Sequence, residues 1–304
     1  MMVSLYTVEN ALKEVYLGVL SNQLNTQVSP VLAKINHSSS DVWGKEIRKL
    51  PNWYKNYQDC PMLVSNVETM YGKIEISDKA IRVSQNSTGA LVNLLNTELE
   101  SLLRVTIKAI SDAFFDEDKE FVEVNGQKLN NHTKIKTSGL KELFSDSEKI
   151  YGLERAKYVE LNPVVKTIKE FNPYEIQEII DNNNDRVDFM ICNPKVKRKY
   201  QESFTRQAIE IQELGSFKCL LFNGTIPIIP VREVPENEIY FISTEDFTLH
   251  QLCDWKWLED INGHILRQDE AKPFYNASLV KYGNYICENP YKQIKIVLEE
   301  KADE

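Results

Sequence analysis

The longest regular pattern of apolar and polar positions in the chain covers residues 88–115. Apolar residues recur there at spacings of three and four, so that Leu91, Leu95, Leu99 and Leu102 share one stripe of a helix. At about 1.5 Å per residue the helix would be about 40 Å long. Since helices in globular proteins average about 11 residues, this pattern predicts a long axial helix whose core face is the leucine stripe.

A charged region with strand-like alternation precedes this helix. Residues 41–50 (DVWGKEIRKL) predict one strand and residues 67–84 (VETMYGKIEISDKAIRVS) contain a second. In the second, Met70, Ile74 and Ile76 alternate with polar residues, which is the period of a half-buried strand. The two strands predict a long β-hairpin.

The connection between the two strands, residues 51–66, is rich in aromatic side chains. It contains Trp53, Tyr54 and Tyr57. An isolated two-stranded ribbon is marginal in water and offers aromatic residues no core. Because aromatic residues are enriched at interfaces, we favour contact with an adjacent subunit. The alternative is a loop folded back on its own domain.

The N-terminal region carries a second helical stripe. Over residues 8–25, Val8, Leu12, Val15 and Val19 repeat at spacings of three and four and predict one apolar face. Such a helix packs either on its own domain or on a neighbouring subunit, and the pattern leaves both open.

The rest of the chain predicts mixed helix and strand. A hairpin is expected over residues 121–135, turning at Asn125 and Gly126. A helix is expected to begin near Pro173 and to end in an asparagine run, followed by a buried strand in residues 185–194 and a helix near residues 196–204. The final third is rich in short strands separated by glycine and proline.

Composition narrows the functional classes. With 304 residues and 42% hydrophobic residues the chain can bury a large core. Its net charge of -9 disfavours tight sequence-specific DNA binding. Only 11 glycines are present and the glycine-rich phosphate motifs are absent, which disfavours nucleotide binding.

The cysteines and the N-terminus predict a cytoplasmic protein. The five cysteines are scattered and never form a C-x-x-C pair, as expected of reduced thiols. The N-terminus has no signal-peptide pattern, and no apolar stretch approaches the length of a membrane span.

No set of residues predicts catalysis, a metal or a cofactor. The four histidines lack zinc-ligand spacing. His250 and Cys253 lie near Asp254, but three-residue spacing in an alternating strand would direct the histidine and the thiol to opposite faces. A basic cluster is better explained as a solvated helix face than as an anion site, and it comprises Lys195, Lys197, Arg198 and Lys199.

The order of these segments resembles the major capsid proteins of tailed bacteriophages. The segments that carry the resemblance are the hairpin YGKIEISDKAIRVS, the long helix, DRVDFMICNPK, NGTIPIIPVREVPENEIYFIS and YGNYICENPYKQIKI. The resemblance implies an α+β capsid fold, shared with encapsulins. That fold has an N-terminal arm, an extension loop formed by the hairpin, a spine helix with a peripheral β-sheet, and a central axial domain.

Transferred to this chain, the resemblance implies six segments. These are an N-terminal arm (1–36), an extension loop (37–80), a peripheral domain with the spine helix (81–121), an axial domain (122–234), a peripheral sheet return (235–278) and closing axial strands (279–304). The extension loop would supply the assembly interface through Trp43, Lys45, Arg48, Trp53, Tyr54 and Tyr57.

The resemblance also implies a function and partners. The chain would be a non-enzymatic shell subunit that forms hexamers and pentamers around packaged double-stranded DNA, which it contacts non-specifically. Because its first methionine directly precedes the arm, we expect a separate scaffolding protein, together with a portal. The expected location is the virion, assembled in the host cytoplasm. The alternatives are an encapsulin-type compartment and a monomeric α+β enzyme or binding module.

Overall fold

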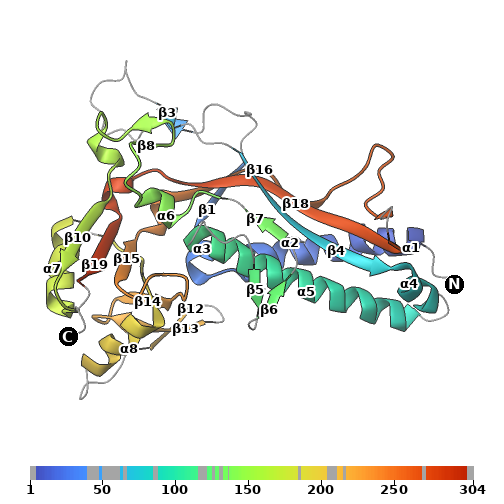
Figure 1. The fold of residues 1–304 in the computed structure, drawn as a ribbon, viewed down its shortest axis with the longest axis horizontal. Helices are drawn as coiled ribbons and strands as arrows, with labels where there is room; N and C mark the ends of the chain where they lie inside the picture. Colours follow the sequence, from blue (N-terminus) through green and yellow to red (C-terminus); the bar gives the residue numbers. More distant parts are fainter. Residues whose placement is uncertain are drawn as a thin grey trace.

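The protein folds around two β-sheets, seen in a computed structural model (Figure 1). The structure describes residues 5–39, 48–49, 62–63, 67–84, 88–115, 122–124, 127–129, 133–135, 137–183, 186–203, 211–214, 217–268 and 272–299.

Among the described residues the first sheet has six strands, and it is long and narrow (Figure 1). Its order is β1 (Asn36–Ser39), β16 (Phe247–Trp257), β18 (Phe274–Cys287), β4 (Glu68–Ser77) and β7 (Thr133–Ile135), with β17 (Arg267–Gln268) paired to β18. β18 and β4 pair antiparallel along the whole length of β4. Met70, Ile74 and Ile76 are buried on β4 and alternate with more exposed residues, which confirms the predicted alternation.

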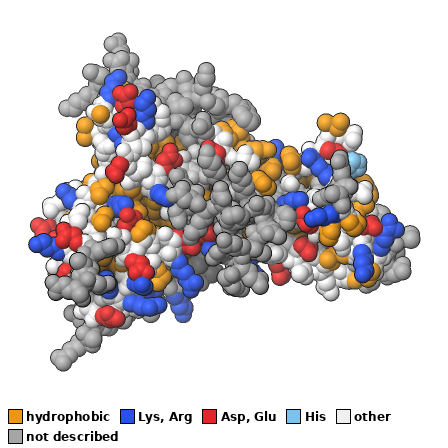
Figure 2. Space-filling model, in the orientation of Figure 1, with side chains coloured by type: hydrophobic (Ala, Val, Ile, Leu, Met, Phe, Trp, Pro, Cys, Tyr) orange, Lys and Arg blue, Asp and Glu red, His pale blue; other side chains and the backbone are white. Residues whose placement is uncertain are grey.

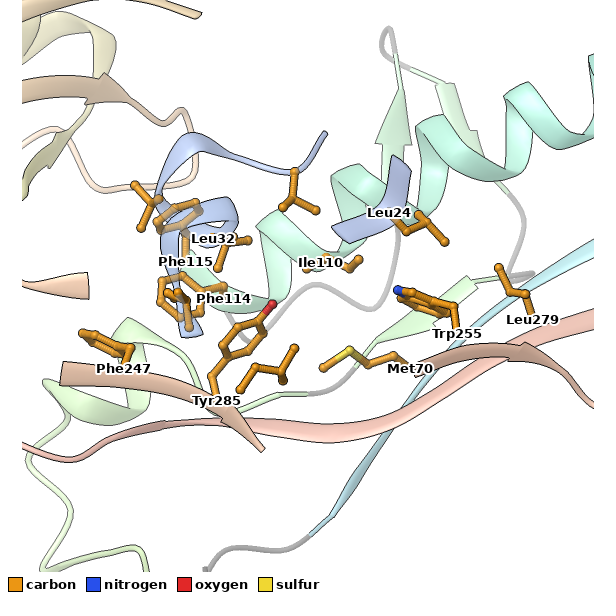
Figure 3. Close-up of a cluster of buried hydrophobic side chains, with 14 of the residues drawn as sticks. Leu24, Leu32, Met70, Ile110, Phe114, Phe115, Phe247, Trp255, Leu279 and Tyr285 are labelled. Carbon is orange, nitrogen blue, oxygen red and sulfur yellow. The ribbon is translucent and has the colours of Figure 1, made fainter. Parts of the chain in front are cut away.

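Helix α5 (Thr88–Phe115) lies along this sheet and confirms the predicted long helix. The stripe Leu91, Leu95, Leu99 and Leu102 is at most 4% exposed. Close to its C-terminal end, Phe114 packs edge-to-face on Tyr285 of β18, with ring centres 5.2 Å apart (Figure 3). The helix and the sheet therefore share one apolar core.

The N-terminal helices pack on the same core. They are α1 (Leu5–Asn10), the π-helix η1 (Ala11–Tyr16), α2 (Leu17–Thr26) and α3 (Pro30–Lys34). α2 contacts both β16 and α5. Figure 3 shows Leu24 of α2 beside Ile110 of α5 and above Trp255 of β16.

The second sheet has seven strands. Its order is β10 (Val164–Ile168), β19 (Ile294–Leu298), β15 (Glu238–Ile242), β11 (Phe189–Cys192), β14 (Ile226–Pro230), β13 (Phe217–Phe222) and β12 (Ile211–Leu214). Helices α7 (Pro173–Asn183) and α8 (Pro194–Ser203) contribute buried residues to the core on one of its faces. The opposite face joins the core of the first sheet, so alternate residues of β11 enter different cores. The predicted helices and the buried strand of this region are confirmed.

Short elements complete the described chain. They are α4 (Asp78–Ser84), α6 (Leu140–Leu143), the 3-10 turns η2 (Val159–Leu161), η3 (Thr244–Asp246) and η4 (Pro290–Lys292), and the strand pairs β2 (Arg48–Lys49) with β3 (Met62–Leu63), β5 (Val122–Val124) with β6 (Gln127–Leu129), and β8 (Lys149–Ile150) with β9 (Leu153–Glu154). The pairing of Val124 with Gln127 confirms the hairpin predicted at residues 125–126.

Three strands can be placed relative to the expected segments, whose boundaries stay a prediction. β4 lies within the segment 37–80, which is expected to form the extension loop, and pairs in the long sheet. β15 lies within the expected segment 235–278 and pairs in the seven-stranded sheet, and β18 continues across the boundary expected at residue 278. Local alternation identifies a strand, but its partners lie far away in the sequence, so alternation alone does not assign a strand to a sheet.

Candidate assembly surfaces

The predicted N-terminal stripe is divided between two faces of the helices. Val8 and Leu12 are fully buried in the core. Val15 and Val19 are 64% and 54% exposed and form what we call the outer face. The single apolar face expected from the spacing is therefore not one buried surface within the subunit.

The π-helix explains this division. Positions four apart drift around an α-helix, which has about 3.6 residues per turn. The π-helix η1 has wider turns because its hydrogen bonds run from i to i+5. These wider turns rotate α2 back relative to α1. Leu20 and Leu24 of α2 therefore face the core on the same side as Val8 and Leu12, and Val15 and Val19 do not.

A buried carboxylate fixes α1 to the loop between β16 and β17. Glu9 is 5% exposed. Its carboxylate accepts a hydrogen bond from the backbone N–H of Ile265 and lies 3.0 Å from Nδ1 of His264. One turn later, Lys13 pairs with Glu259 at 3.0 Å and donates to the carbonyl of Gly263. These contacts hold the helix against the tip of the long sheet.

A second anchor joins α2 to the middle of the sheet. Asp254 of β16 accepts hydrogen bonds from Ser21 at 2.8 Å and from Asn25 at 3.1 Å. Lys281 of β18 is buried beside them, with its Nζ 3.0 Å from the side-chain oxygen of Asn25. Buried lysines are rare unless paired, and here the amine is held by groups from two elements, Asn25 of α2 and Asp254 of β16.

The two sheets meet at two short crossings of the chain. β15 leads through η3 into β16, and β18 leads through η4 into β19. At this junction Asp188 accepts hydrogen bonds from the N–H and hydroxyl of Thr244 at 2.9 and 2.7 Å, and pairs with Lys34 at 3.0 Å. Gln293 bridges the two crossings by accepting from the N–H of Ser243 and donating to Asp246.

The candidate interface residues of the predicted extension loop fall largely outside the described residues. Only the backbone of Arg48 is described, in β2, which pairs with β3. In the same pair of strands, Lys49 pairs with Met62. The other predicted interface residues lie outside the described chain, namely Trp43, Lys45, Trp53, Tyr54 and Tyr57.

Further exposed apolar side chains lie far from the shared core. Ile261, between β16 and β17, is fully exposed, and Tyr174 at the start of α7 is 86% exposed. Tyr6 of α1 is 68% exposed. Among the described side chains on the face shown in Figure 2, acidic and basic groups are interspersed. Isolated exposed apolar residues are common on proteins, so these positions do not by themselves indicate an interface.

Three features of the described residues bear on chemistry. They contain no cluster of three or more His, Cys, Asp or Glu side chains suited to a metal ion. Cys192 is buried, which raises the pKa of its thiol to about 12 and keeps it protonated. A hollow of about 620 Å³ beside β8 and β9 is lined by Asp146, Glu148 and Glu154 together with Lys149 and Arg155.

The structure bears on two expectations about chemistry, the His250 and Cys253 pair and the basic cluster on α8. A bulge in β16 between Gln251 and Cys253 interrupts the alternation of side chains. Alternation therefore does not place His250 and Cys253 on opposite faces of the strand. In the basic cluster, Lys195 pairs with Glu236 at 2.6 Å, while Val196 and Tyr200 form the buried side of α8.

Of the described helices, none is both long and apolar enough to cross a bilayer.

Comparison with known proteins finds similar solved structures but no similar sequence. No family model matches the chain, and no curated protein matches its sequence. The fold is similar to the holo-SrpI encapsulin complex from Synechococcus elongatus PCC 7942, with a TM-score of 0.54 and 9% identity over 91% of this chain and 92% of the other. It is equally similar to the capsid of cyanophage A-1(L), with a TM-score of 0.54 and 10% identity over 92% of each chain.

The chain has the fold seen in phage capsid proteins and encapsulins. The capsid of a native GTA particle extends the comparison, with a TM-score of 0.51 and 9% identity over 90% of this chain and 91% of the other. At these identities the similarity is one of fold. Within this capsid fold, α5 and the long sheet form one body and the seven-stranded sheet forms the other.

Proposed function

We propose that this chain is the major capsid protein of a tailed double-stranded DNA bacteriophage. Its subunits would form hexamers and pentamers that close into an icosahedral shell. The observation that carries this proposal is the coverage of the shared fold, since the match to the cyanophage capsid includes 92% of both chains. Little of the chain remains outside that fold to form a separate catalytic or binding domain.

Two surfaces are proposed as contacts between subunits. The first is the aromatic segment between β2 and β3, with Trp53, Tyr54 and Tyr57 covered by a neighbour. The second is the outer face of the N-terminal helices, where Val15 and Val19 remain exposed although the other side of the same helices is buried. Covering both would remove apolar side chains from water.

The charge of the chain supports the role of a container. A net charge of -9 gives the subunit no overall attraction for phosphates, so packaged DNA would be held without specific binding. We propose a separate scaffolding protein and a portal as assembly partners. The site of action would be the virion, after assembly in the host cytoplasm.

An encapsulin-type compartment is the second candidate. It is favoured by one observation, namely that the TM-score to the SrpI encapsulin complex, 0.54, equals that to the cyanophage capsid. A phage capsid and an encapsulin would be built from subunits of the same fold. The two differ in what the shell encloses.

Negative-stain microscopy of the expressed chain, with and without a scaffolding protein, tests the proposal. We expect rings and closed shells. Only single subunits under all of these conditions would contradict both candidates. Phage assembly predicts that shells made with the scaffolding protein and portal protect DNA from nuclease, whereas shells that retain only protein cargo would favour the encapsulin.

Deleting residues 52–60 tests the role of the aromatic segment. The shortened chain should fold and should assemble poorly, as circular dichroism and microscopy would show. Normal assembly of this variant would refute the contact proposed for Trp53, Tyr54 and Tyr57. A replacement of the same residues by a glycine and serine linker of equal length separates loss of the aromatic rings from loss of reach.

A further inference from the structure

A buried lysine in the longest strand contacts a side-chain amide. Lys281 of β18 is only 2% exposed, and its Nζ lies 5.9 Å from the ring centre of Trp255. Its Nζ donates to the side-chain oxygen of Asn25, on α2, at 3.0 Å. The amine is therefore next to the carboxamide group of a residue that is distant in the sequence.

A single carboxylate contacts both nitrogen atoms of this pair. Asp254 lies 3.4 Å from Nζ of Lys281 through Oδ1. It also accepts from Nδ2 of Asn25, at 3.1 Å through Oδ1 and 3.2 Å through Oδ2. The hydroxyl of Ser21 and the N–H of Trp255 each donate to this carboxylate at 2.8 Å, which fixes its position.

The environment favours a reactive amine. Burial lowers the pKa of Lys281, so its neutral, nucleophilic form is easier to reach than that of an exposed lysine. Burial opposes ionisation of Asp254, but hydrogen bonds from Asn25, Ser21 and Trp255 and the charge of Lys281 together hold its pKa below the ordinary value. An ionised carboxylate beside the amine can accept its proton.

We propose that Lys281 and Asn25 join in an intramolecular isopeptide bond, with Asp254 carrying the proton between their nitrogens. The neutral Nζ attacks Cγ of Asn25 and forms a new N–C bond. The bond from Cγ to Nδ2 breaks, and Asp254 transfers one proton from Nζ to Nδ2. The amide nitrogen leaves as ammonia, and the step needs no oxidant or co-reactant.

The bond would tie the N-terminal helix α2 to strand β18 within one subunit. The two residues are 256 positions apart, so the link would close most of the chain into a loop. A cross-link across a long loop restricts the unfolded chain and thereby stabilises the folded one. The inference is independent of shell assembly, because every atom involved belongs to one chain.

The intact mass of the wild-type protein under denaturing conditions tests the proposal without any variant. We expect the mass to be lower than that of the sequence by one ammonia molecule. Tryptic digestion should yield a branched peptide containing Asn25 and Lys281, with no cleavage after Lys281. A full-length mass after prolonged incubation would overturn the proposal. So would loss of ammonia with Lys281 still free, which indicates a cyclic imide at Asn25.

One variant within the cluster and one control outside it test the role of the carboxylate. Asp254→Asn keeps the size of the side chain but removes the proton acceptor, so the protein should retain its ammonia and remain unlinked. Asn22→Ala, on an exposed position of the same helix, should link like the wild type. Linkage of Asp254→Asn at the wild-type rate would refute the role assigned to Asp254.

Discussion

At the scale of single residues, a glycine sets the distance between the long sheet and the spine helix. A Cβ at Gly72 of β4 would lie 2.6 Å from Cδ1 of Leu102 and 2.8 Å from Oγ1 of Thr106. Because both atoms belong to a packed face of α5, Gly72→Ala should lower the free energy of unfolding by about 1–3 kcal/mol. Urea denaturation of the unassembled subunit measures this change.

Gly18 provides a control of opposite sign. A Cβ there would have no atom within 4 Å, and the residue lies on the exposed side of α2. Gly18→Ala should therefore raise the free energy of unfolding by about 0.5–1 kcal/mol, because alanine loses less conformational entropy in a helix. If both substitutions changed stability alike, the close contact at Gly72 would not be the cause.

Asp188 should make the junction between the sheets sensitive to acid. Burial opposes its ionisation, but hydrogen bonds from Thr244 and the ion pair with Lys34 lower its pKa overall. Asp188→Ala should cost about 1–3 kcal/mol near neutral pH, because two hydrogen bonds and a charge partner are lost. Urea denaturation of both proteins across pH measures the difference.

The sign of the pH dependence follows from the lowered pKa. A carboxyl with a lowered folded-state pKa stabilises the protein above its unfolded-state pKa, and this stability is lost as pH falls through the folded-state pKa. The difference between wild type and Asp188→Ala should therefore shrink below about pH 4. Glu245→Ala, which removes an exposed pair with Arg186, should cost under about 1 kcal/mol at neutral pH. A difference for Asp188→Ala that stays constant into acid would contradict this account.

At the scale of elements, the spine helix is held by its leucine stripe. Leu99 is 3% exposed and faces the shared core. Leu99→Ala should lower the free energy of unfolding by about 2–5 kcal/mol, since it leaves a cavity. Val92→Ala, at a position on the same helix that is 40% exposed, should cost well under half as much. Equal effects in thermal or urea unfolding would mean that α5 is not anchored through this stripe.

The two faces of the N-terminal helices should separate folding from assembly. Val19→Asp should leave stability within about 0.5 kcal/mol of wild type, because surface substitutions are usually that mild. The same substitution should reduce the yield of shells, because it places a charge on the proposed contact. Leu20→Asp, at the neighbouring buried position, should prevent folding. Wild-type shell yield from Val19→Asp would exclude the outer face as an interface.

Sequence patterns predicted individual helices and strands better than they predicted which strands pair with each other. The helix over residues 88–115 was predictable because one stripe repeats along its whole length, and β4 because Met70, Ile74 and Ile76 alternate. The pairing of β4 with β18 was not, because the two strands are far apart in the chain. The exposure of Val15 and Val19 depended on a π-helix that the spacing did not indicate.

The polar anchors were missed for the same physical reason. Asn25 is far along the sequence from Asp254 and Lys281, and only the folded structure brings the three side chains together. A lysine among the apolar residues of β18 was the one local signal, since such a residue needs a buried partner. Similarly, nothing local to Glu9 indicated its contacts with Ile265 and His264.

At the scale of the whole molecule, two sheets share a core and expose apolar groups at distant points. Alternate residues of β11 enter two cores, and the double crossing through η3 and η4 carries a polar network. These contacts should hold the two bodies in a fixed arrangement, as a building block needs. An assembly of such blocks would use the surfaces that the subunit leaves uncovered.

The mass of the particles formed by the purified chain tests the central proposal most directly. The single chain has a mass of 35.2 kDa. Mass photometry and sedimentation should show pentamers or hexamers and closed shells, with a scaffolding protein supplied where needed. Particles of only the single-chain mass, under every such condition, would contradict the proposal that this protein is a shell subunit.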